Sequence, residues 1–165
     1  MVFKQIKFNP IFYLPVLFVI LAVLFLLNMN NQKDGKDLVS EIPEITPRPS
    51  LAINGSKILV DIADTPEKRT LGLSGRLSLA QDEGMFFILD SPGRFSFWMK
   101  DMNFPIDIIW IDAEFKVADI TKNAIPESFP NTFEPRAPIL YVLETVAGWA
   151  DKNGIKIGDT VLFHK

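Results

Sequence analysis

The longest apolar stretch of the chain lies near its N-terminus, at residues 11–27 (IFYLPVLFVILAVLFLL), and no charged residue stands between Lys7 and Lys33. As an α-helix, a run of this length measures about 25 Å, which is the short end of what spans a bilayer. The run has no polar face, whereas a helix in a soluble core alternates with polar positions. We therefore predict a single transmembrane helix at residues 11–27, with the lipid bilayer as a partner of the chain.

A cleaved signal peptide is the alternative interpretation of this run. The sequence after it reads NMNNQK, with neither a small-x-small cleavage site nor a lipobox cysteine, which favours an uncleaved signal-anchor. Basic residues are nearly balanced across the run, with Lys4 and Lys7 before it and Lys33 and Lys36 after it. Because the upstream lysines are closer to the bilayer edge, we predict a cytoplasmic N-terminus at residues 1–10. The rest of the chain is then expected outside the cytoplasm, on a single-pass protein of the cell membrane.

Polar residues and prolines take over at residues 28–50, which include Pro43, Pro47 and Pro49. Such a segment buries too little apolar surface to offset its ordering entropy, and its prolines keep it extended. We predict a flexible linker there. Regular apolar patterning resumes at Leu51, and residues 51–165 are expected to form one globular domain.

Short apolar runs separated by turn residues dominate this domain. A hairpin is predicted from residues 51–53 and 58–63 around Asn54-Gly55, a pair that tolerates positive φ. A short helix should follow, with Thr65 as N-cap, Pro66 in its first turn and Gly72 at its end. Further strands are predicted at residues 85–89, 95–99, 106–111, 116–121, 139–143 and 161–163, and a second short helix at 145–153. The pattern indicates a mainly β (α+β) fold: a small, β-barrel-like rolled sheet of about seven to eight strands with two short helices.

The balance of charge and the missing residue types exclude several functions. From Leu51 onward the chain carries 12 Lys and Arg against 16 Asp and Glu, a net charge of −4, without the basic run that nucleic-acid binding requires. There is no cysteine, and the one histidine is His164, next to the C-terminus, where fraying is common. A serine triad, a cysteine nucleophile and a zinc site therefore lack their usual residues. We predict no catalytic residue, no metal and no cofactor.

Five segments occur in a recognisable order: ADTPEKRTLGLSGR, GMFF, FWMKDMNFPIDIIWID, YVLETVAGW and GIKIGD. Together they resemble the family called domain of unknown function 192 over nearly all of residues 58–163, and the third segment is the most specific. The resemblance implies a compact domain with a β-barrel-like core, often behind a signal or membrane segment, and it implies no activity. This sequence departs from the family pattern at Ser74, at Asp101-Met102 and at Glu114-Phe115, where methionine, Asn-Thr and glycine are usual.

Asp107 stands in a mostly apolar strand of the most specific segment, where an ionised carboxylate needs a partner or a raised pKa. The favoured interpretation is that Asp107 pairs with Lys100 or an arginine and fixes a loop. General acid or base work is the alternative. Arg69 and Arg76 flank the first helix, and their guanidinium groups suit either a carboxylate of the domain, such as Asp107 or Glu144, or that of a ligand.

Strand spacing separates the side chains around Trp98 into two faces. Phe95, Phe97 and Met99 share one face, which is most simply core, while Trp98 and Lys100 share the other. An aromatic ring beside a cation suits a sugar or an anionic ligand, and a tryptophan that covers a barrel end predicts the same sequence. Copper(I) ligation by Met85, Met99 and Met102 is less favoured than apolar packing. The proline-rich residues 123–138 are long enough for a binding loop, or pack one barrel end instead.

Three classes of function remain after these exclusions. We favour a non-catalytic extracytoplasmic module that binds a small molecule, a glycan or a peptide through Trp98, Lys100, Arg69, Arg76 and Asp107. The first alternative is a carboxylate-based hydrolase of the cell envelope, which needs two acids facing an open cleft. The second is a scaffold subunit of an envelope complex, which would expose a large apolar patch.

Overall fold

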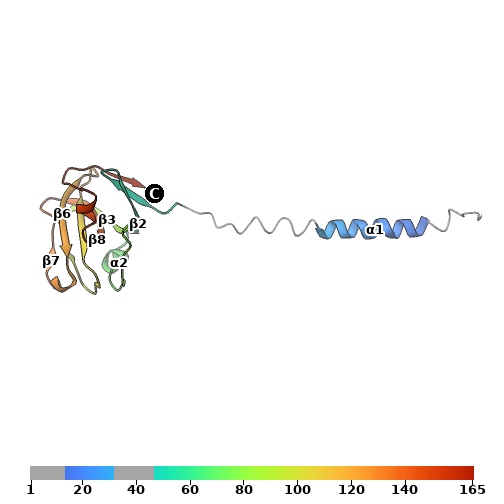
Figure 1. The fold of residues 1–165 in the computed structure, drawn as a ribbon, viewed down its shortest axis with the longest axis horizontal. Coiled ribbons are helices and arrows are strands. Elements are labelled where there is room, and N and C mark those ends of the chain that lie inside the picture. Colours follow the sequence, from blue (N-terminus) through green and yellow to red (C-terminus); the bar gives the residue numbers. More distant parts are fainter. Residues whose placement is uncertain (1–13, 32–46) are drawn as a thin grey trace, which may run out of the picture. The chain divides into compact units, whose positions relative to one another are not determined.

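The computed structural model describes residues 14–31 and 47–165 (Figure 1). The chain divides between two units, 1–46 and 47–165, and each is considered by itself. The predicted cytoplasmic N-terminus, the first residues of the predicted membrane span and most of the predicted linker lie outside the described residues.

A single helix, α1 (Leu14–Asn31), is described in the first unit, and it includes most of the apolar run at residues 11–27. Its apolar side chains from Phe18 to Leu27 are exposed. Within the described residues, no helix is both long enough and apolar enough to cross a membrane. The span predicted at residues 11–27 starts before the described part of the chain and stays a prediction.

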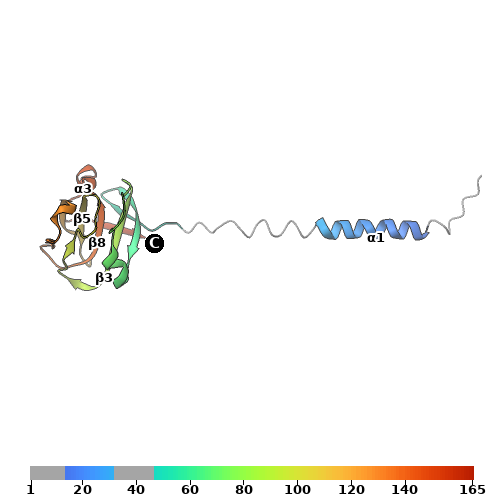
Figure 2. The ribbon, with the colours of Figure 1, turned by 90° about the horizontal axis from the view of Figure 1, so that it is seen from below.

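The second unit is built on a seven-stranded sheet with the order β6-β5-β8-β3-β2-β1-β9 and a separate two-stranded ribbon of β4 and β7 (Figures 1 and 2). In the described part of this unit the strands are β1 (Ser50–Ile53), β2 (Ser56–Ala63), β3 (Glu83–Gly93), β4 (Phe97–Trp98), β5 (Ile106–Ile111), β6 (Val117–Ala124), β7 (Thr132–Phe133), β8 (Ile139–Val146) and β9 (Val161–His164). The helices are α2 (Pro66–Leu71), the 3₁₀ turn η2 (Pro126–Ser128) and α3 (Trp149–Lys152).

The large sheet curls into a half-barrel, which Figure 2 shows in a second view. At one end its two edges approach each other, because the Val117 N–H donates to the Asp159 oxygen (2.9 Å) and the Val161 N–H donates to the Phe115 oxygen (2.8 Å). All neighbouring strands are antiparallel except β2 and β3. A parallel pair needs a crossover connection, and α2 forms part of it. The prediction of a mainly β fold with short helices is confirmed, with a half-barrel as the form of the rolled sheet.

Local turn and cap chemistry behaves as the sequence predicts. Asn54 and Gly55 both have positive φ (49° and 78°) in the β1–β2 turn. The Thr65 hydroxyl accepts a hydrogen bond from the Lys68 N–H at the start of α2, and Gly72 (φ 52°) ends that helix. Phe115 also has positive φ (56°), in the turn between β5 and β6, and its ring stacks on Tyr141 with centroids 4.4 Å apart.

Several predicted boundaries are wrong, and one of them matters for the site. The expected strand 139–143 continues as β8 to Val146, and the expected helix 145–153 shrinks to the four residues of α3. Thr145 and Val146 are β-branched and pair with β3 and β5 respectively, so they stay extended. Gly148 (φ 85°) then turns the chain into α3. The strand expected at residues 95–99 is reduced to the two residues of β4.

Both faces of the central strands are buried, so the core has two parts. All six residues of β5 are buried, which explains the nearly continuous apolar run IDIIWI. Alternate residues point to opposite faces: Phe86 and Leu143 belong to one apolar cluster, and Phe87 and Val142 to the other. The second cluster, which also contains Leu73 and Met99, packs beneath α2 and β4 and forms the floor of the candidate site.

Candidate ligand-binding cavity

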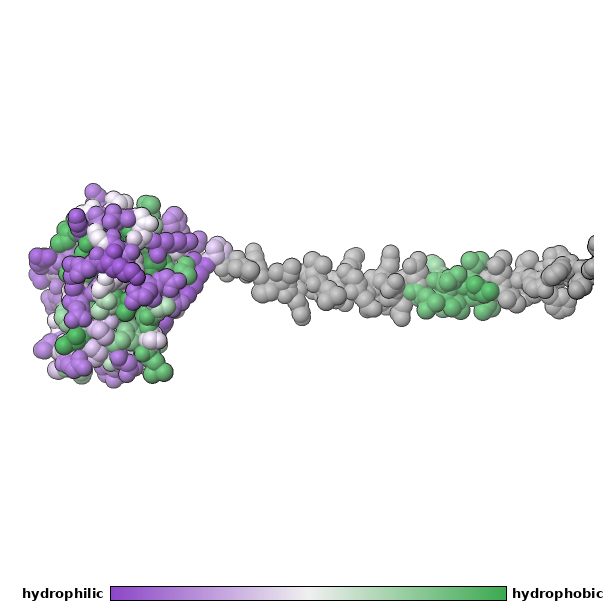
Figure 3. All heavy atoms as spheres, viewed as in Figure 1, coloured by the Kyte–Doolittle hydropathy of each residue, from purple (hydrophilic) through white to green (hydrophobic). Residues whose placement is uncertain are grey.

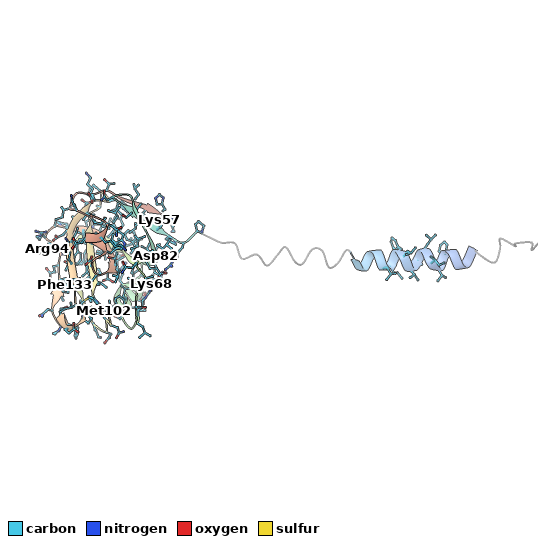
Figure 4. The ribbon with its side chains drawn as sticks, viewed as in Figure 1. Lys57, Lys68, Asp82, Arg94, Met102 and Phe133 are labelled. Carbon is cyan, nitrogen blue, oxygen red and sulfur yellow. The ribbon has the colours of Figure 1, made fainter. Side chains whose placement is uncertain are left out.

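A cavity of about 440 Å³ lies where α2 and the residues around β4 face strands β3 and β8. Its apolar lining is rich in aromatic rings and consists of Pro66, Leu71, Gly72, Leu73, Phe87, Leu89, Phe95, Phe97, Trp98 and Met102. Its polar lining consists of Arg69, Thr70, Ser74, Asp90, Ser91, Ser96 and Glu144. Met102 lies toward the end of the domain that holds α2 (Figure 4). A largely apolar hollow with a few polar groups is the usual form of a small-molecule site.

Two neighbouring central strands supply the floor of the cavity. Glu144 on β8 lies directly opposite Met85 on β3 and Ile108 on β5. It shares its face of the sheet with Val142, two residues earlier on β8, and with Phe87, diagonally across on β3. A side chain at the neighbouring Gly84 would meet the backbone oxygen of Glu144 at 2.8 Å, so the strands approach closely here. Glu144 is thus a carboxyl group set into an otherwise apolar part of the sheet.

Burial makes the carboxyl group of Glu144 a weaker acid than usual. The residue is 5% exposed, and no group among the described residues donates a hydrogen bond to its carboxyl oxygens or accepts one from its hydroxyl. No side-chain oxygen or nitrogen in the described residues is both fully inaccessible and without a partner, so the carboxyl oxygens of Glu144 keep some accessible surface. Glu144 is also a lining residue of the cavity. Loss of water contact raises the pKa of Glu144 to about 8. At neutral pH the group is therefore mainly a neutral acid, able to donate a hydrogen bond.

Arg69 extends from α2 into the cavity wall and fixes the chain around it. Its guanidinium donates to the backbone oxygens of Asp64 (3.1 Å) and Ile88 (2.8 Å) and to the carboxylate of Asp90 (2.8 Å). The arginine side chain is 16% exposed, whereas that of Asp90 is 83% exposed. Arg69 therefore links α2 to Ile88 and Asp90 of β3. Its charge is balanced by the carboxylate of Asp90, and not by Asp107 or Glu144.

Trp98 lies at the mouth of the cavity and is 49% exposed. Its neighbour Phe97 points into the core, where its ring meets those of Phe87 and Trp110 edge-on, with centroids 5.1 and 5.3 Å apart. Met99 is buried, as the alternation predicts. The backbone after Trp98 is tethered to the α2 loop, because the Ser74 hydroxyl donates to the Lys100 oxygen (2.8 Å). A half-exposed indole is thus held on a fixed backbone.

Two apolar side chains of the lining are exposed. Trp98 is 49% exposed, and Leu71 is 63% exposed. In Figure 3 apolar residues gather over the end of the domain where α2 lies in Figure 1, while polar residues cover most of the remaining visible face. The rim of the cavity is therefore accessible to a partly apolar ligand.

The structure does not bring all five predicted site residues together. Trp98 and Arg69 line the cavity, whereas Lys100 lines a neighbouring hollow that also has Trp98 in its wall. Arg76 lies in a third hollow on the β2 side of α2, where it donates to Asp61 (2.8 Å). Burial acts to raise the pKa of Asp61, but the hydrogen bonds from Arg76 and Arg48 outweigh it and hold that pKa below its usual value.

Asp107 lies in the interior and lines none of these hollows. Its two carboxylate oxygens accept hydrogen bonds from the backbone N–H groups of Asn123 (2.9 Å) and Ala150 (3.0 Å). The prediction that it pairs with Lys100 or an arginine is therefore wrong, because backbone amides satisfy it. The carboxylate fastens the end of β6 and the start of α3 to β5.

The remaining candidates take part in packing or lie at the surface. Met85 and Met99 are buried in the apolar cluster beneath α2, and His164 ends the edge strand β9. Within residues 123–138, Phe133 packs on the same cluster and pairs with Phe97 across the small ribbon. Among the residues the structure describes, no group of three or more His, Cys, Asp and Glu side chains is placed to hold a metal.

The importance of Glu144 was not evident from the sequence, where it stands near a predicted strand end as one of several carboxylates and as a possible partner for an arginine. Ending the strand at residue 143 placed Glu144 at a boundary, where an acid is ordinary. The usable signal was the segment YVLETV, since alternation puts Glu144 on one face with Val142 and Val146. An acid flanked by β-branched residues in a strand indicates a buried carboxyl group.

The chain belongs to the family described as DUF192, "Uncharacterized ACR", whose model matches residues 50–163. The resemblance found in the sequence is thereby confirmed. This family defines the class of protein by its fold and assigns no activity.

Solved structures with this fold include the following two. One is a protein of unknown function from Novosphingobium aromaticivorans, with 32% identity and a TM-score of 0.65 over 68% of this chain and 83% of that one. The other, from Sinorhizobium meliloti, is described as a candidate transcription regulator, with 30% identity and a TM-score of 0.65 over 70% of this chain and 92% of that one. A comparison with curated proteins found no match.

Proposed function

We propose that the domain is a non-catalytic module that binds a small, largely apolar molecule in the cavity beneath α2. The observation that carries this proposal is the buried, unpaired carboxyl group of Glu144, which opens into a cavity walled by aromatic rings. A carboxyl group at such a position costs stability compared with a leucine or methionine. Its presence where no group of the described residues forms a hydrogen bond with it supports a role in ligand recognition.

The lining of the cavity favours a small molecule over a glycan or a peptide. Carbohydrates and peptides present many polar groups, and these require matching donors and acceptors. Here Arg69 is already engaged by Asp64, Ile88 and Asp90, and the central lining is made of Phe87, Phe97 and other apolar groups. A compact apolar molecule that inserts past Trp98 would bury most of its surface there.

A carboxylate-based hydrolase is the second candidate, and one observation favours it. Asp90 and Glu144 both line the cavity, and their surroundings differ, since Asp90 is exposed beside Arg69 while Glu144 is buried. Two carboxyl groups that face one cavity are the arrangement that acid-base hydrolysis uses. The engagement of Asp90 with Arg69 makes binding the better supported of the two functions.

Replacement of Trp98 by alanine tests the binding site. Because the indole is half-exposed, we expect Trp98→Ala to change the free energy of unfolding by less than about 1 kcal/mol. Loss of its ring from the mouth should weaken binding of the hydrocarbon probe 2-isopropylnaphthalene roughly 5- to 30-fold. Equilibrium dialysis measures the binding, and thermal melting measures the stability.

Phe129→Ala is the matched control for this variant. Phe129 is 45% exposed, close to the 49% of Trp98, and does not line the cavity. This control should bind the probe as the wild type does. Equal binding by all three proteins would place the ligand elsewhere, and no binding by any of them would defeat the proposed function.

We further propose that residues 11–27 anchor the chain in the cell membrane with the domain outside the cytoplasm. The support is the apolar run itself, which has no charged residue between Lys7 and Lys33. The protein should remain in the membrane fraction after carbonate washing at its full-length mass, and protease added to intact cells should remove the domain. A mature N-terminus after residue 27 would contradict the anchor, and complete protection from protease would reverse the orientation.

A further inference from the structure

We propose that Glu144, in its protonated form, donates a hydrogen bond to a carbonyl-type oxygen of a neutral, largely apolar ligand. This inference rests on the proposed function and names the chemical class of the ligand. It begins with the geometry at the floor of the cavity, where Glu144 stands opposite Met85 and Ile108. Neither neighbouring strand offers the carboxyl group a polar side chain at these positions, so its hydrogen-bonding capacity is left for a group that enters the cavity.

An anionic ligand is disfavoured by the lining. Arg69 is the basic residue among the lining side chains, and its guanidinium already donates to three acceptors. One of these is the Asp90 carboxylate, which also lines the cavity and would repel an anion. A ligand carboxylate or phosphate would therefore have to displace existing bonds before it gained a cation.

A cationic ligand would find favourable aromatic faces at Phe87, Phe97 and Trp98. To form an ion pair at the floor, however, it would have to ionise Glu144 inside an apolar site. The cost of taking both charges out of water offsets much of their attraction. A neutral acceptor needs no ionisation, because burial already keeps the carboxyl group protonated at neutral pH.

Burial, and not a neighbouring charge, raises the pKa of Glu144. Arg69 comes from α2 and Asp90 from β3, and these two pair with each other. The β5 side contributes Ile108 opposite Glu144, and no titratable side chain of β5 or β8 other than Glu144 lines the cavity within the described residues. Ligand binding that depends on the protonated acid should therefore weaken as pH rises through the range in which Glu144 ionises.

Three probes of one shape separate the possible ligand classes: 2-acetylnaphthalene carries a carbonyl oxygen, 2-isopropylnaphthalene a methyl group in its place, and 1-(2-naphthyl)ethylamine a cationic amine. The full chain in detergent serves for all measurements, and each affinity is compared with that of the hydrocarbon. Partition of the probes into micelles then affects wild type and variants equally. We expect the wild type at about pH 6 to bind the ketone roughly 3- to 10-fold more tightly than the hydrocarbon.

Two variants isolate the role of the carboxyl group. Glu144→Leu removes the donor and should abolish the preference for the ketone while keeping hydrocarbon binding. Glu144→Gln keeps the shape and an N–H donor, so the preference should survive. Between about pH 7 and pH 9 the wild type should lose roughly 10-fold in ketone affinity as Glu144 ionises, and Glu144→Gln should lose none. Rescue by Gln together with loss of the pH response is a result that a merely structural role would not give.

The outcomes distinguish this inference from the proposed function. If the wild type binds ketone and hydrocarbon equally at every pH, the cavity binds ligands but the inference is wrong. A preference for the amine that grows with pH also overturns it, in favour of an organic cation. If the wild type binds none of the three probes, the proposed function fails and the inference fails with it.

Discussion

Asp107→Ala should be among the most destabilising single substitutions in the domain, with an expected loss of about 3–5 kcal/mol in the free energy of unfolding. The carboxylate accepts hydrogen bonds from the backbone N–H groups of Asn123 and Ala150, and the residue is 1% exposed. Alanine would leave two buried donors unpaired and a small void beside them. A domain of this size has only modest stability in reserve, so the variant is expected to melt far below the wild type or to be unfolded.

Asp112→Ala is the matched control for that result. Asp112 also accepts two backbone N–H bonds, from Glu114 (3.0 Å) and Lys116 (2.8 Å), but it does so in a surface turn. Water can replace its carboxylate, and the expected loss is about 1 kcal/mol. Chemical denaturation of both variants makes the comparison. Equal, small losses for both would show that the interior position of Asp107 does not matter in the way the structure indicates.

Glu144→Gln should stabilise the protein by an amount that grows with pH. In the unfolded chain Glu144 has its ordinary pKa of 4.5, whereas burial raises the pKa in the folded state to about 8. Between these two pKa values, the folded state therefore holds a proton on Glu144 that the unfolded state has lost. The corresponding stability is fully present below the unfolded pKa and is lost as pH rises through the folded one.

Glutamine has nearly the same shape and does not ionise, so the difference between variant and wild type reports Glu144. We expect the variant to gain on the order of 4 kcal/mol at about pH 8.5 and less than about 1 kcal/mol at about pH 5. Other titrations cancel in this difference. Hydrogen bonds from Arg136 lower the pKa of Asp119 to about 2, so Asp119 titrates well below this range. Parallel stability curves for the two proteins across this pH range would show that the carboxyl group is hydrated or paired.

Much of the fold was predictable because it depends on local chemistry. Asn54-Gly55, Thr65 and Gly72 act over a few residues, and each produces the turn or helix end that the sequence indicates. The pairing of strands was not predictable in the same way. The parallel contact of β2 with β3 and the central position of β8 come from residues far apart in the chain.

The candidate site was predictable only in part, for the same physical reason. Alternation correctly placed Trp98 on the outer face and Met99 in the core. It could not reveal which partners Asp107 and Arg69 would take, since backbone amides and carbonyls carry no sequence signal. Glu144 was underrated because the predicted strand ended at residue 143, whereas β8 continues to Val146 and includes it. Burial on both faces of a sheet becomes visible only when the strands are assembled.

A crystal structure of residues 47–165 with 2-isopropylnaphthalene would test the binding cavity most directly. The seven-stranded sheet and both of its apolar clusters lie within these residues, so the domain carries its own core. We expect the probe between α2 and strands β3 and β8, with its rings against Phe87 and Trp98 and one end toward Glu144. An unoccupied cavity at saturating probe, or a probe bound only at another surface, would contradict the account.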